Sequence, residues 1–315
     1  MISVILLFLL FCSILILSGS FLVKSLVKIS SFLRLGEFVV GFIIMAFATT
    51  IPEFFVGITS ALNKTSDIAL GTVIGSNIAD LSLIMGIAII LSRKGIKFEH
   101  KSLKRDTTYM FLIALLPLIL MYFGNVISRT DGIILILILS FYMFRMLKRR
   151  SQFRKTVKDN IKRYEILLYI FIFIISLIVL YLSADYVVKY STLLSIELSL
   201  PTILIGLLLV ALGTSLPELI FGTRAVLSGH PDMILGDILG AVVVNSTLVI
   251  GVSAIIFPIT ANWLLFWISA AFMMLIAFIF MTFVHTGRKL YWQQGVVLIW
   301  LYMFFVMIEL YVKML

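Results

Sequence analysis

Charged residues are scarce in this sequence. Asp, Glu, Lys and Arg make up 13% of its 315 residues, whereas hydrophobic residues make up 62%. A soluble domain has about a quarter charged and about half apolar residues, so the composition excludes an ordinary soluble protein. Several apolar runs reach the roughly 20 residues needed to cross a hydrocarbon core of about 30 Å. Because the short alternating segments of a membrane β-barrel are absent, the sequence predicts an all-α polytopic membrane protein.

Cysteine and histidine are scarce as well. Cys12 is the single cysteine, so the chain cannot form an internal disulfide. His100, His230 and His285 fall in loops or near the ends of the apolar segments. A zinc or copper site is therefore not expected, and neither is a membrane enzyme built on a His–metal set. The sequence predicts no resident cofactor.

The chain also lacks a basic stretch before its first apolar run, which extends from residue 2 to about residue 27. A cleaved signal peptide carries such a stretch, so we expect this run to be a retained membrane helix. Ten membrane spans are predicted in all. They cover about residues 2–25, 37–61, 68–92, 108–123, 127–146, 165–189, 202–227, 233–257, 261–285 and 291–312.

Basic residues lie mostly on one side of the predicted spans. All of the 25 lysines and arginines except Lys64, Arg129, Lys189 and Lys313 fall on the side of the loop at residues 147–164. Cytoplasmic loops of membrane proteins are enriched in Lys and Arg, so we expect this loop in the cytoplasm and both termini outside. The net charge of +10 is then a topology signal and a contact for anionic lipids, rather than a surface for nucleic acid.

The sequence also repeats itself. A shift of 165 residues aligns Pro52 and Glu53 with Pro217 and Glu218, and gives 11 identities over residues 41–80 without a gap. Rare Pro, Glu and Gly residues align in this way, which apolar composition alone does not explain. The chain is therefore expected to contain an internal duplication.

Each half of this duplication contains five predicted spans. We expect two five-helix repeats, at residues 1–146 and 165–315, joined by the basic loop at 147–164. Because five is odd, the second repeat would enter the membrane in the opposite orientation. Inverted-topology repeats are typical of transporters, in which the binding site lies near the membrane midplane between the repeats.

Three acidic residues fall inside predicted spans, namely Glu53, Asp80 and Glu218, and Asn245 is the repeat counterpart of Asp80. Each intramembrane carboxylate costs at least about 2.5 kcal/mol, so three at similar depth require a compensating partner. No Lys or Arg falls in the middle of these helices, so a bound cation is the simplest partner. The alternative for each glutamate taken alone is a structural hydrogen bond.

The two glutamates end the motifs ATTIPE, at residues 48–53, and GTSLPE, at residues 213–218. Each motif proline lacks an amide hydrogen, so the carbonyl oxygen four residues earlier loses its helical donor. Oxygen ligands suit hard cations such as Ca²⁺ and Na⁺. Hydroxyl groups in membrane helices commonly bond to their own helix, which is their structural alternative. The motif hydroxyls belong to Thr49, Thr50, Thr214 and Ser215.

Structural roles are expected for several other residues. Asp237 is predicted to face the cytoplasmic interface, and Asp185 and Glu309 are predicted to be hydrated near the ends of their spans. Four glycines with GxxxG spacing are predicted to let helices pack closely. They are Gly71, Gly75, Gly236 and Gly240.

The two motifs resemble the paired G-T-S-[LV]-P-[DE] motifs of the cation/Ca²⁺ antiporter superfamily. GTVIGSNIAD, at residues 71–80, resembles the family segment G-N-x-I-G-S-N-x-x-[DN]. The chain is most similar to the prokaryotic sodium/calcium exchanger branch, strongly so over about residues 37–92 and 202–257. The resemblance implies a multi-pass antiporter of the cell membrane that extrudes Ca²⁺ against inward Na⁺ flow.

The resemblance also implies a set of ion ligands. The motif glutamates would bind Ca²⁺ together with carbonyl oxygens of the motif threonines, and Na⁺ sites beside them would use hydroxyl groups and alanine carbonyl oxygens. Ca²⁺, Na⁺ and membrane lipids are the implied partners, and the chain is expected to act as a monomer. The implied ligands are Glu53, Glu218, Thr49, Thr214, Asp80 and Asn245 at the centre, and Thr50, Ser215, Ser76, Ala46 and Ala211 at the Na⁺ sites.

The chain departs from the family pattern in its second half. Ala241 stands where Ser76 predicts a hydroxyl group, which weakens one Na⁺ site, and the order of Asp80 and Asn245 reverses the usual Asn-then-Asp. A proton-coupled or K⁺-dependent exchanger is therefore the alternative, because clustered carboxylates repel one another and can carry a proton. The G-N-x-x-E segment of proton-coupled relatives is absent. A channel is a further alternative, although it needs no inverted repeat.

Overall fold

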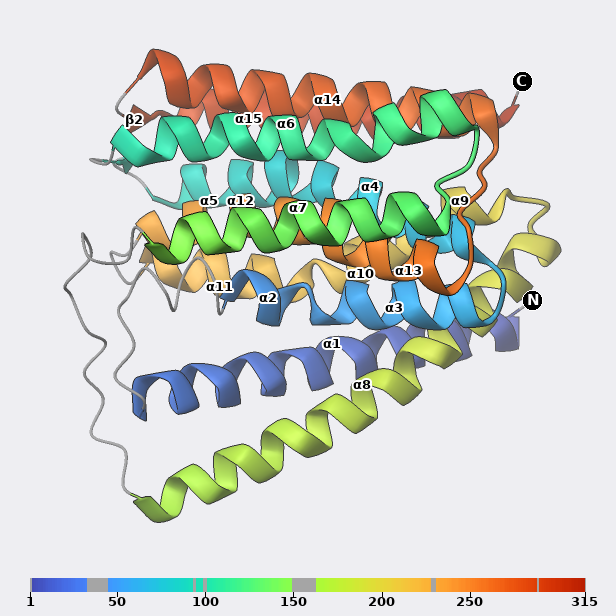
Figure 1. The fold of residues 1–315 in the computed structure, drawn as a ribbon, viewed down its shortest axis with the longest axis horizontal. Coiled ribbons are helices and arrows are strands. Elements are labelled where there is room, and N and C mark those ends of the chain that lie inside the picture. The colour runs from blue at the N-terminus through green and yellow to red at the C-terminus, as the bar shows by residue number, and fades with distance from the viewer. Residues whose placement is uncertain are drawn as a thin grey trace.

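The computed structural model describes residues 2–32, 45–92, 95–98, 101–148, 163–227, 231–287 and 289–314. They form a bundle of helices with two very short strands (Figure 1). The all-α class predicted from the composition is confirmed. The elements, with η for π-helical turns, are α1 (Ile2–Phe32), α2 (Ala46–Thr49), α3 (Ile51–Leu62), α4 (Ser66–Ala79), η2 (Asp80–Ile84), α5 (Met85–Leu91), β1 (Ile96–Lys97), α6 (Lys101–Gly124), α7 (Arg129–Lys148), α8 (Arg163–Glu197), α9 (Thr202–Ile205), η4 (Gly206–Val210), α10 (Ala211–Thr214), α11 (Leu216–Leu227), α12 (Pro231–Val244), η5 (Asn245–Val249), α13 (Ile250–Ile256), α14 (Trp263–Thr286), β2 (Lys289–Leu290) and α15 (Trp292–Met314).

Eight helical segments in the described ranges are long and apolar enough to cross a membrane, so the multi-span membrane class is confirmed but the number ten is not. The predicted span at 37–61 begins outside the described residues, and its described part is divided between α2 and α3. The predicted span at 127–146 corresponds to α7, which is not among the eight. Most of the predicted loop at 147–164 lies outside the described residues.

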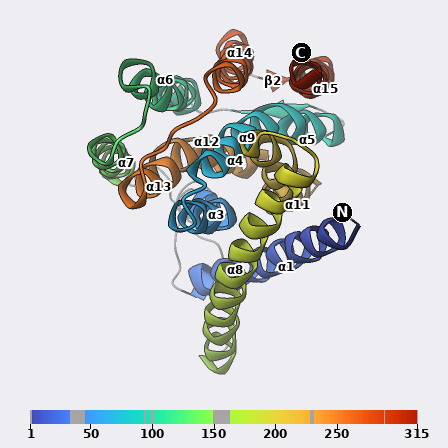
Figure 2. The same cartoon turned by 90° about the vertical axis from the view of Figure 1, so that its right-hand side faces the viewer.

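The two longest helices, α1 and α8, pack against each other on one side of the bundle and splay away from it (Figures 1 and 2). α8 has 35 residues without Gly or Pro, and it runs to Glu197 instead of ending near residue 189 as predicted. At 1.5 Å per residue such a helix is about 52 Å long, which exceeds the hydrocarbon thickness of about 30 Å. This helix must therefore tilt or extend beyond the hydrocarbon core.

The secondary structure of the two halves matches element by element. α2, α3, α4, η2 and α5 begin and end 165 residues before α10, α11, α12, η5 and α13, as Asp80 and Asn245 at the starts of η2 and η5 illustrate. A π-helical turn is rare and occurs frequently at functional sites. Its presence at both duplicated positions points to the neighbourhood of Asp80 and Asn245.

Short backbone pairings lie at the two ends of the bundle. β1, which follows α5, pairs antiparallel with β2, which precedes α15. Ile127, between α6 and α7, forms an isolated bridge with Ile259, between α13 and α14. β2 lies at one end of the bundle, whereas the α6–α7 and α13–α14 connections lie at the other (Figure 1). α1 begins and α15 ends at this second end, and α8 begins at the first.

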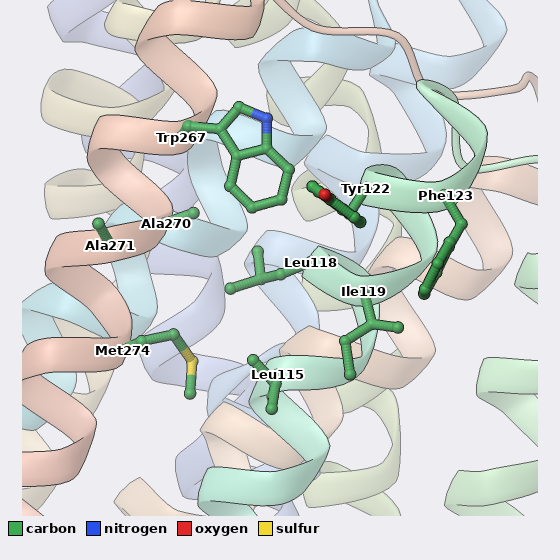
Figure 3. Close-up of a pocket in the computed structure, with 9 residues that line it drawn as sticks. All are labelled: Leu115, Leu118, Ile119, Tyr122, Phe123, Trp267, Ala270, Ala271 and Met274. Carbon is green, nitrogen blue, oxygen red and sulfur yellow. The ribbon is translucent and has the colours of Figure 1, made fainter.

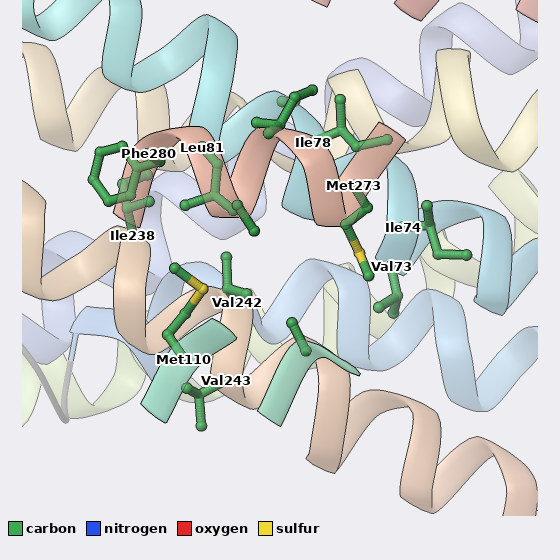
Figure 4. Packing of buried hydrophobic residues seen from close by; sticks show 14 of the residues in the cluster. Val73, Ile74, Ile78, Leu81, Met110, Ile238, Val242, Val243, Met273 and Phe280 are labelled. Atoms are coloured by element: carbon green, nitrogen blue, oxygen red, sulfur yellow. The ribbon is translucent and has the colours of Figure 1, made fainter. Parts of the chain in front are cut away.

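The interior of the bundle is formed by α4–α5 and α12–α13. In each of these two segments 83% of the most apolar window is buried, compared with 17% for α8. Apolar side chains of α4, η2 and α12 interdigitate there with those of α6 and α14 (Figure 4). The labelled residues of this cluster are Val73, Ile74, Ile78, Leu81, Met110, Ile238, Val242, Val243, Met273 and Phe280.

Gly71 and Gly75 allow α4 to approach the second half closely, as their spacing predicts. A Cβ atom on Gly75 would lie 2.7 Å from the Cβ of Ala211 and would also overlap the carbonyl oxygen of Leu207. A Cβ atom on Gly71 would overlap the carbonyl oxygen of Ile203. These contacts hold α4 against the segment that leads into the GTSLPE motif.

Replacing Gly75 by alanine is expected to destabilise the protein by about 1–3 kcal/mol, because backbone atoms must move to admit the methyl group. The measurement is the melting temperature of the detergent-purified protein, which should fall by several degrees. Gly124→Ala is the matched control, because no atom lies within 4 Å of its added Cβ. Equal melting temperatures for the two variants would contradict the close approach.

Candidate functional site

Both motifs interrupt their helices in the same way. α2 ends at Thr49 and Thr50 forms a turn before α3, while Ser215 separates α10 from α11. Each motif proline is the second residue of the new helix, where no amide hydrogen is needed. The break leaves the carbonyl groups of Ala48 and Gly213 without the donor that a continuous helix would supply.

Glu53 lies at the centre of a group of hydroxyl side chains from both halves. Its side chain is only 1% exposed. The hydroxyl of Ser76, on α4, donates to Glu53 Oε1 at 3.1 Å, and that of Ser215 donates to the same atom at 3.5 Å. Thr214 Oγ1 lies 3.4 Å from Ser76 Oγ. Glu53 Oε2 has no hydrogen-bond partner. The structure therefore brings four of the predicted site residues together.

Glu218 and Asp80 are also buried, and each is 1% exposed. Glu218 Oε2 and both carboxylate oxygens of Asp80 have no hydrogen-bond partner. Asp80, Glu218 and Glu53 lie close enough to repel one another when they are ionised, so the three carboxylates share one region of the protein. A buried carboxylate without donors is unfavourable unless a cation or a proton compensates its charge.

Asn245 contacts a polar pair that the sequence did not single out. Its Nδ2 donates to Asn77 Oδ1 at 3.2 Å, and Asn77 Nδ2 donates to Ser246 Oγ at 3.0 Å. Asn245 Oδ1 remains buried without a partner. Asn77 falls within the GTVIGSNIAD segment, and its amide is the signal that could have identified it.

The carbonyl oxygens of the two alanines already accept hydrogen bonds. Ala46 O accepts from the Thr50 hydroxyl at 2.6 Å and from the Thr50 amide at 3.3 Å. Ala211 O accepts from the Ser215 amide at 3.0 Å and from the Thr214 hydroxyl at 3.2 Å. A carbonyl oxygen has two lone pairs, so each would have to share or release a bond in order to contact an ion.

The prediction for Asp237 was wrong. This residue does not face the cytoplasmic interface, because it is 0% exposed and its Oδ1 accepts from the Thr49 hydroxyl at 3.2 Å. Asp237, Ala241 and Asn245 are spaced by four residues, which places them on one face of the continuous helical segment formed by α12 and η5. That periodicity was visible in the sequence and could have placed Asp237 with the site.

The prediction for Glu309 was also wrong. Its side chain, on α15, is 0% exposed, and its Oε1 lies 2.5 Å from the Ser269 hydroxyl of α14. Packing between α14 and α15 therefore encloses the carboxylate, which a hydrated or snorkelling role would leave exposed. Asp185, on α8, is half-buried and accepts from Asn63 Nδ2 at 3.0 Å.

The donor set of the site consists of oxygen atoms. Within the described ranges, no three Asp, Glu, His or Cys side chains form a group that could hold a metal ion by themselves. Residues 46–62, 66–91 and 231–256 contain no Lys or Arg, so no side-chain cation within these segments neutralises the acids. A cation bound here would need carbonyl, amide or hydroxyl oxygens in addition to carboxylates, which suits Na⁺ or Ca²⁺.

A cavity of about 350 Å³ between α6 and α14 is a different feature (Figure 3). Leu115, Leu118, Trp267 and Met274 are among its lining residues, and none of the predicted site residues reaches it. Its lining contains no carboxylate, so this cavity cannot supply the ligands of a cation.

Comparison with known proteins identifies the family. The model of the family described as "Sodium/calcium exchanger protein" matches residues 3–148 and residues 168–311, which together make up most of the chain. The chain belongs to this family. The prediction from the two motifs is therefore confirmed at the level of the family.

Individual relatives agree with this assignment. The chain is 28% identical to the sodium/calcium exchanger MaX1 of Methanosarcina acetivorans, over 99% of this chain and 100% of the relative. It is also 28% identical to the inner membrane protein YrbG of Escherichia coli, over 77% of this chain and 76% of the relative. A solved structure of the sodium-calcium exchanger NCX_Mj, soaked with Na⁺ and Ca²⁺, matches with a TM-score of 0.69 and 23% identity, over 97% of this chain and 98% of that one. This structural likeness establishes the exchanger fold.

Proposed function

We propose that the protein is a membrane antiporter that exchanges Ca²⁺ for Na⁺ by alternating access. One observation carries the proposal: Glu53, Glu218, Asp80 and Asn245 hold five buried side-chain oxygen atoms without a hydrogen-bond partner. Desolvated oxygens of this kind are costly unless a ligand contacts them. The names of the relatives, among them the sodium/calcium exchanger MaX1, support Na⁺ and Ca²⁺ as these ligands.

In this proposal Glu53 and Glu218 bind Ca²⁺ centrally, assisted by Asp80 and Asn245. The hydroxyls of Ser76 and Ser215 already point to Glu53, so they are placed to contact an ion that the glutamate holds. Carbonyl and hydroxyl oxygens complete the coordination of the ion, because the carboxylates do not form a complete coordination shell by themselves. The further proposed ligands are Thr49 and Thr214 for Ca²⁺, and Thr50, Ser215, Ser76, Ala46 and Ala211 for Na⁺.

Exchange follows from competition for shared ligands. One Ca²⁺ ion leaves a charge of −1 on the three predicted carboxylates, whereas three Na⁺ ions neutralise them. Since both ion sets use Glu53 and Glu218, they cannot be bound fully at the same time. The site can then carry one set of ions across the membrane and return with the other set bound.

The pair of α1 and α8 is the proposed moving element. Gly19 of α1 lies against both motif prolines, since a Cβ atom there would be 3.2 Å from Pro52 Cγ and 3.6 Å from Pro217 Cγ. α1 therefore touches the two helix breaks at once. A sliding motion of α1 and α8 past the motifs would open the site first to one side of the membrane and then to the other.

We further propose the predicted ten-span topology, with repeats at 1–146 and 165–315 and a cytoplasmic loop at 147–164. The matching elements of the two halves, the separate family matches at 3–148 and 168–311, and the backbone pairings at opposite ends of the bundle support an inverted duplication. Both termini would lie outside the cell. We propose that the protein works as a monomer among membrane lipids and needs no resident cofactor.

A proton-coupled or K⁺-dependent exchanger is the second candidate. Clustered buried carboxylates can exchange protons with the solvent when the site opens. The sodium/potassium/calcium exchanger 1 of Bos taurus is 27% identical over 49% of this chain. The name of this relative supports K⁺ as a further transported ion in the second candidate.

The deciding experiment measures ⁴⁵Ca²⁺ uptake into proteoliposomes under separate gradients of Na⁺, K⁺ and H⁺. Uptake is expected when Na⁺ is inside and absent outside, and not with a pH gradient alone. Uptake driven by the pH gradient without Na⁺ would favour the second candidate. Absence of Ca²⁺ flux under all three gradients would refute Ca²⁺ antiport.

A further inference from the structure

Asp237 is a fourth buried carboxylate in the region of Glu53, Asp80 and Glu218, which is called the transport core below. Its Oδ1 accepts a bond from Thr49, and its Oδ2 is buried without a partner. Its charge interacts unfavourably with those of Glu53, Asp80 and Glu218. Asp237 therefore belongs to the same electrostatic region as the proposed Ca²⁺ site.

The single hydrogen bond to Asp237 is shared. The Thr49 hydroxyl has one hydrogen atom, yet it lies 3.0 Å from Met45 O and 3.2 Å from Asp237 Oδ1. It can donate to one of them at a time. Asp237 is fully buried, and its one hydrogen-bond donor is shared with Met45 O. The negative charge of its carboxylate therefore requires a further positive partner.

The position of Asp237 also distinguishes the two halves. Thr72, Ser76 and Asp80 occupy the face of α4 and η2 that corresponds to Asp237, Ala241 and Asn245 in the second half. The acidic residue is the last of the three in the first half, Asp80, but the first of the three in the second half, Asp237. The displacement is eight residues, or about 12 Å along a helix, so Asp237 cannot simply replace a carboxylate at position 245.

We infer that Asp237, with the hydroxyl of Thr49, forms an additional binding site for a monovalent cation beside the proposed Ca²⁺ site. The inference rests on the proposed function for its role in transport. One carboxylate balances one positive charge, so a site built from Asp237 and the Thr49 hydroxyl suits a monovalent ion, whereas Ca²⁺ needs more carboxylate ligands. With Asp237 the transport core carries four negative charges, and three Na⁺ ions would leave one of them without compensation.

Binding to the purified protein tests the site without requiring transport. Equilibrium binding of ²²Na⁺, and of ⁸⁶Rb⁺ in place of K⁺, is measured without Ca²⁺ for the wild type and for Asp237→Asn. The variant is expected to bind about one monovalent ion fewer per protein, and the ion that it loses identifies the site as a Na⁺ or a K⁺ site. Unchanged stoichiometry and affinity for both ions would overturn the inference and leave Asp237 as a protonated structural group.

A second pair of variants covers the case in which Asp237→Asn does not fold. Thr49→Val keeps the shape and the carbonyl group of Thr49 but removes its hydroxyl, and it should weaken monovalent-ion binding about three- to tenfold. Thr49→Ser should retain wild-type affinity. Wild-type affinity in Thr49→Val would also contradict the site.

The matched control is Asp185→Asn, which removes a half-buried carboxylate on α8. It should bind as many monovalent ions as the wild type. The proposed function can fail independently: if the wild type moves no Ca²⁺ but Asp237→Asn loses one bound monovalent ion, the site stands and Ca²⁺ antiport falls.

Discussion

Glu53→Gln should reduce Na⁺-driven ⁴⁵Ca²⁺ uptake by more than about a hundredfold at subsaturating Ca²⁺. Removing one partner of a buried charge pair costs at least about 3 kcal/mol, and each 1.4 kcal/mol corresponds to a tenfold change in affinity. Glutamine keeps the shape and the hydrogen bonds of Glu53 Oε1, so the loss would report the missing charge. Glu218→Gln is expected to behave in the same way because it occupies the corresponding position in the second motif.

Glu309→Gln is the control for this prediction. Glu309 is also a buried membrane glutamate that contacts a serine hydroxyl, but it lies between α14 and α15 and not at the motifs. Uptake by this variant should stay within about threefold of the wild type, because the change of charge lies outside the proposed site. If Glu53→Gln or Glu218→Gln transports like the wild type, the central-ligand assignment is refuted.

Asp80→Asn is expected to have the second largest effect, a loss of Ca²⁺ uptake of at least about tenfold. Both oxygen atoms of Asp80 are buried without a hydrogen-bond partner, so they are available to a cation. The substitution removes a full negative charge, which is worth more than about 1.4 kcal/mol to a buried cation. The measurement is the dependence of ⁴⁵Ca²⁺ uptake on the Ca²⁺ concentration.

The double variant Asp80→Asn with Asn245→Asp separates charge from position. These residues begin the two matching π-helical turns, so the swap keeps three predicted carboxylates and moves one to the corresponding place. Partial recovery of uptake is expected. No recovery beyond the Asp80→Asn level would show that the two positions are not equivalent, which the contact of Asn245 with Asn77 would then explain.

Much of the proposed site follows from the sequence because its signals are local. A proline forces a helix break wherever it lies in a helical segment, and a glutamate beside it in apolar surroundings needs a partner. The duplication then related Glu53 to Glu218 without any knowledge of their positions in space. The bonds of Ser76 and Ser215 to Glu53 agree with this grouping.

The errors concern residues whose surroundings are set by distant segments. Asp237 was placed at the interface because it lies early in its span, yet α2 covers it and donates to it through Thr49. Glu309 was placed near the head groups because it lies late in its span, yet Ser269 of α14 meets it there. Distance along a helix gives depth in a membrane, but it does not say which neighbour occupies the facing side.

The sequence by itself determined the membrane class, the duplication, the two helix breaks and the identity of the acidic residues. These depend on composition, on periodicity and on the missing amide hydrogen of proline, all of which act within a few residues. Only the tertiary structure decided that Glu53 meets Ser76 and Ser215, that Asn245 meets Asn77, and that Asp237 is enclosed. These contacts join segments more than 20 residues apart. The packing of distant segments against one another creates them, and the local sequence does not specify which side chains become partners.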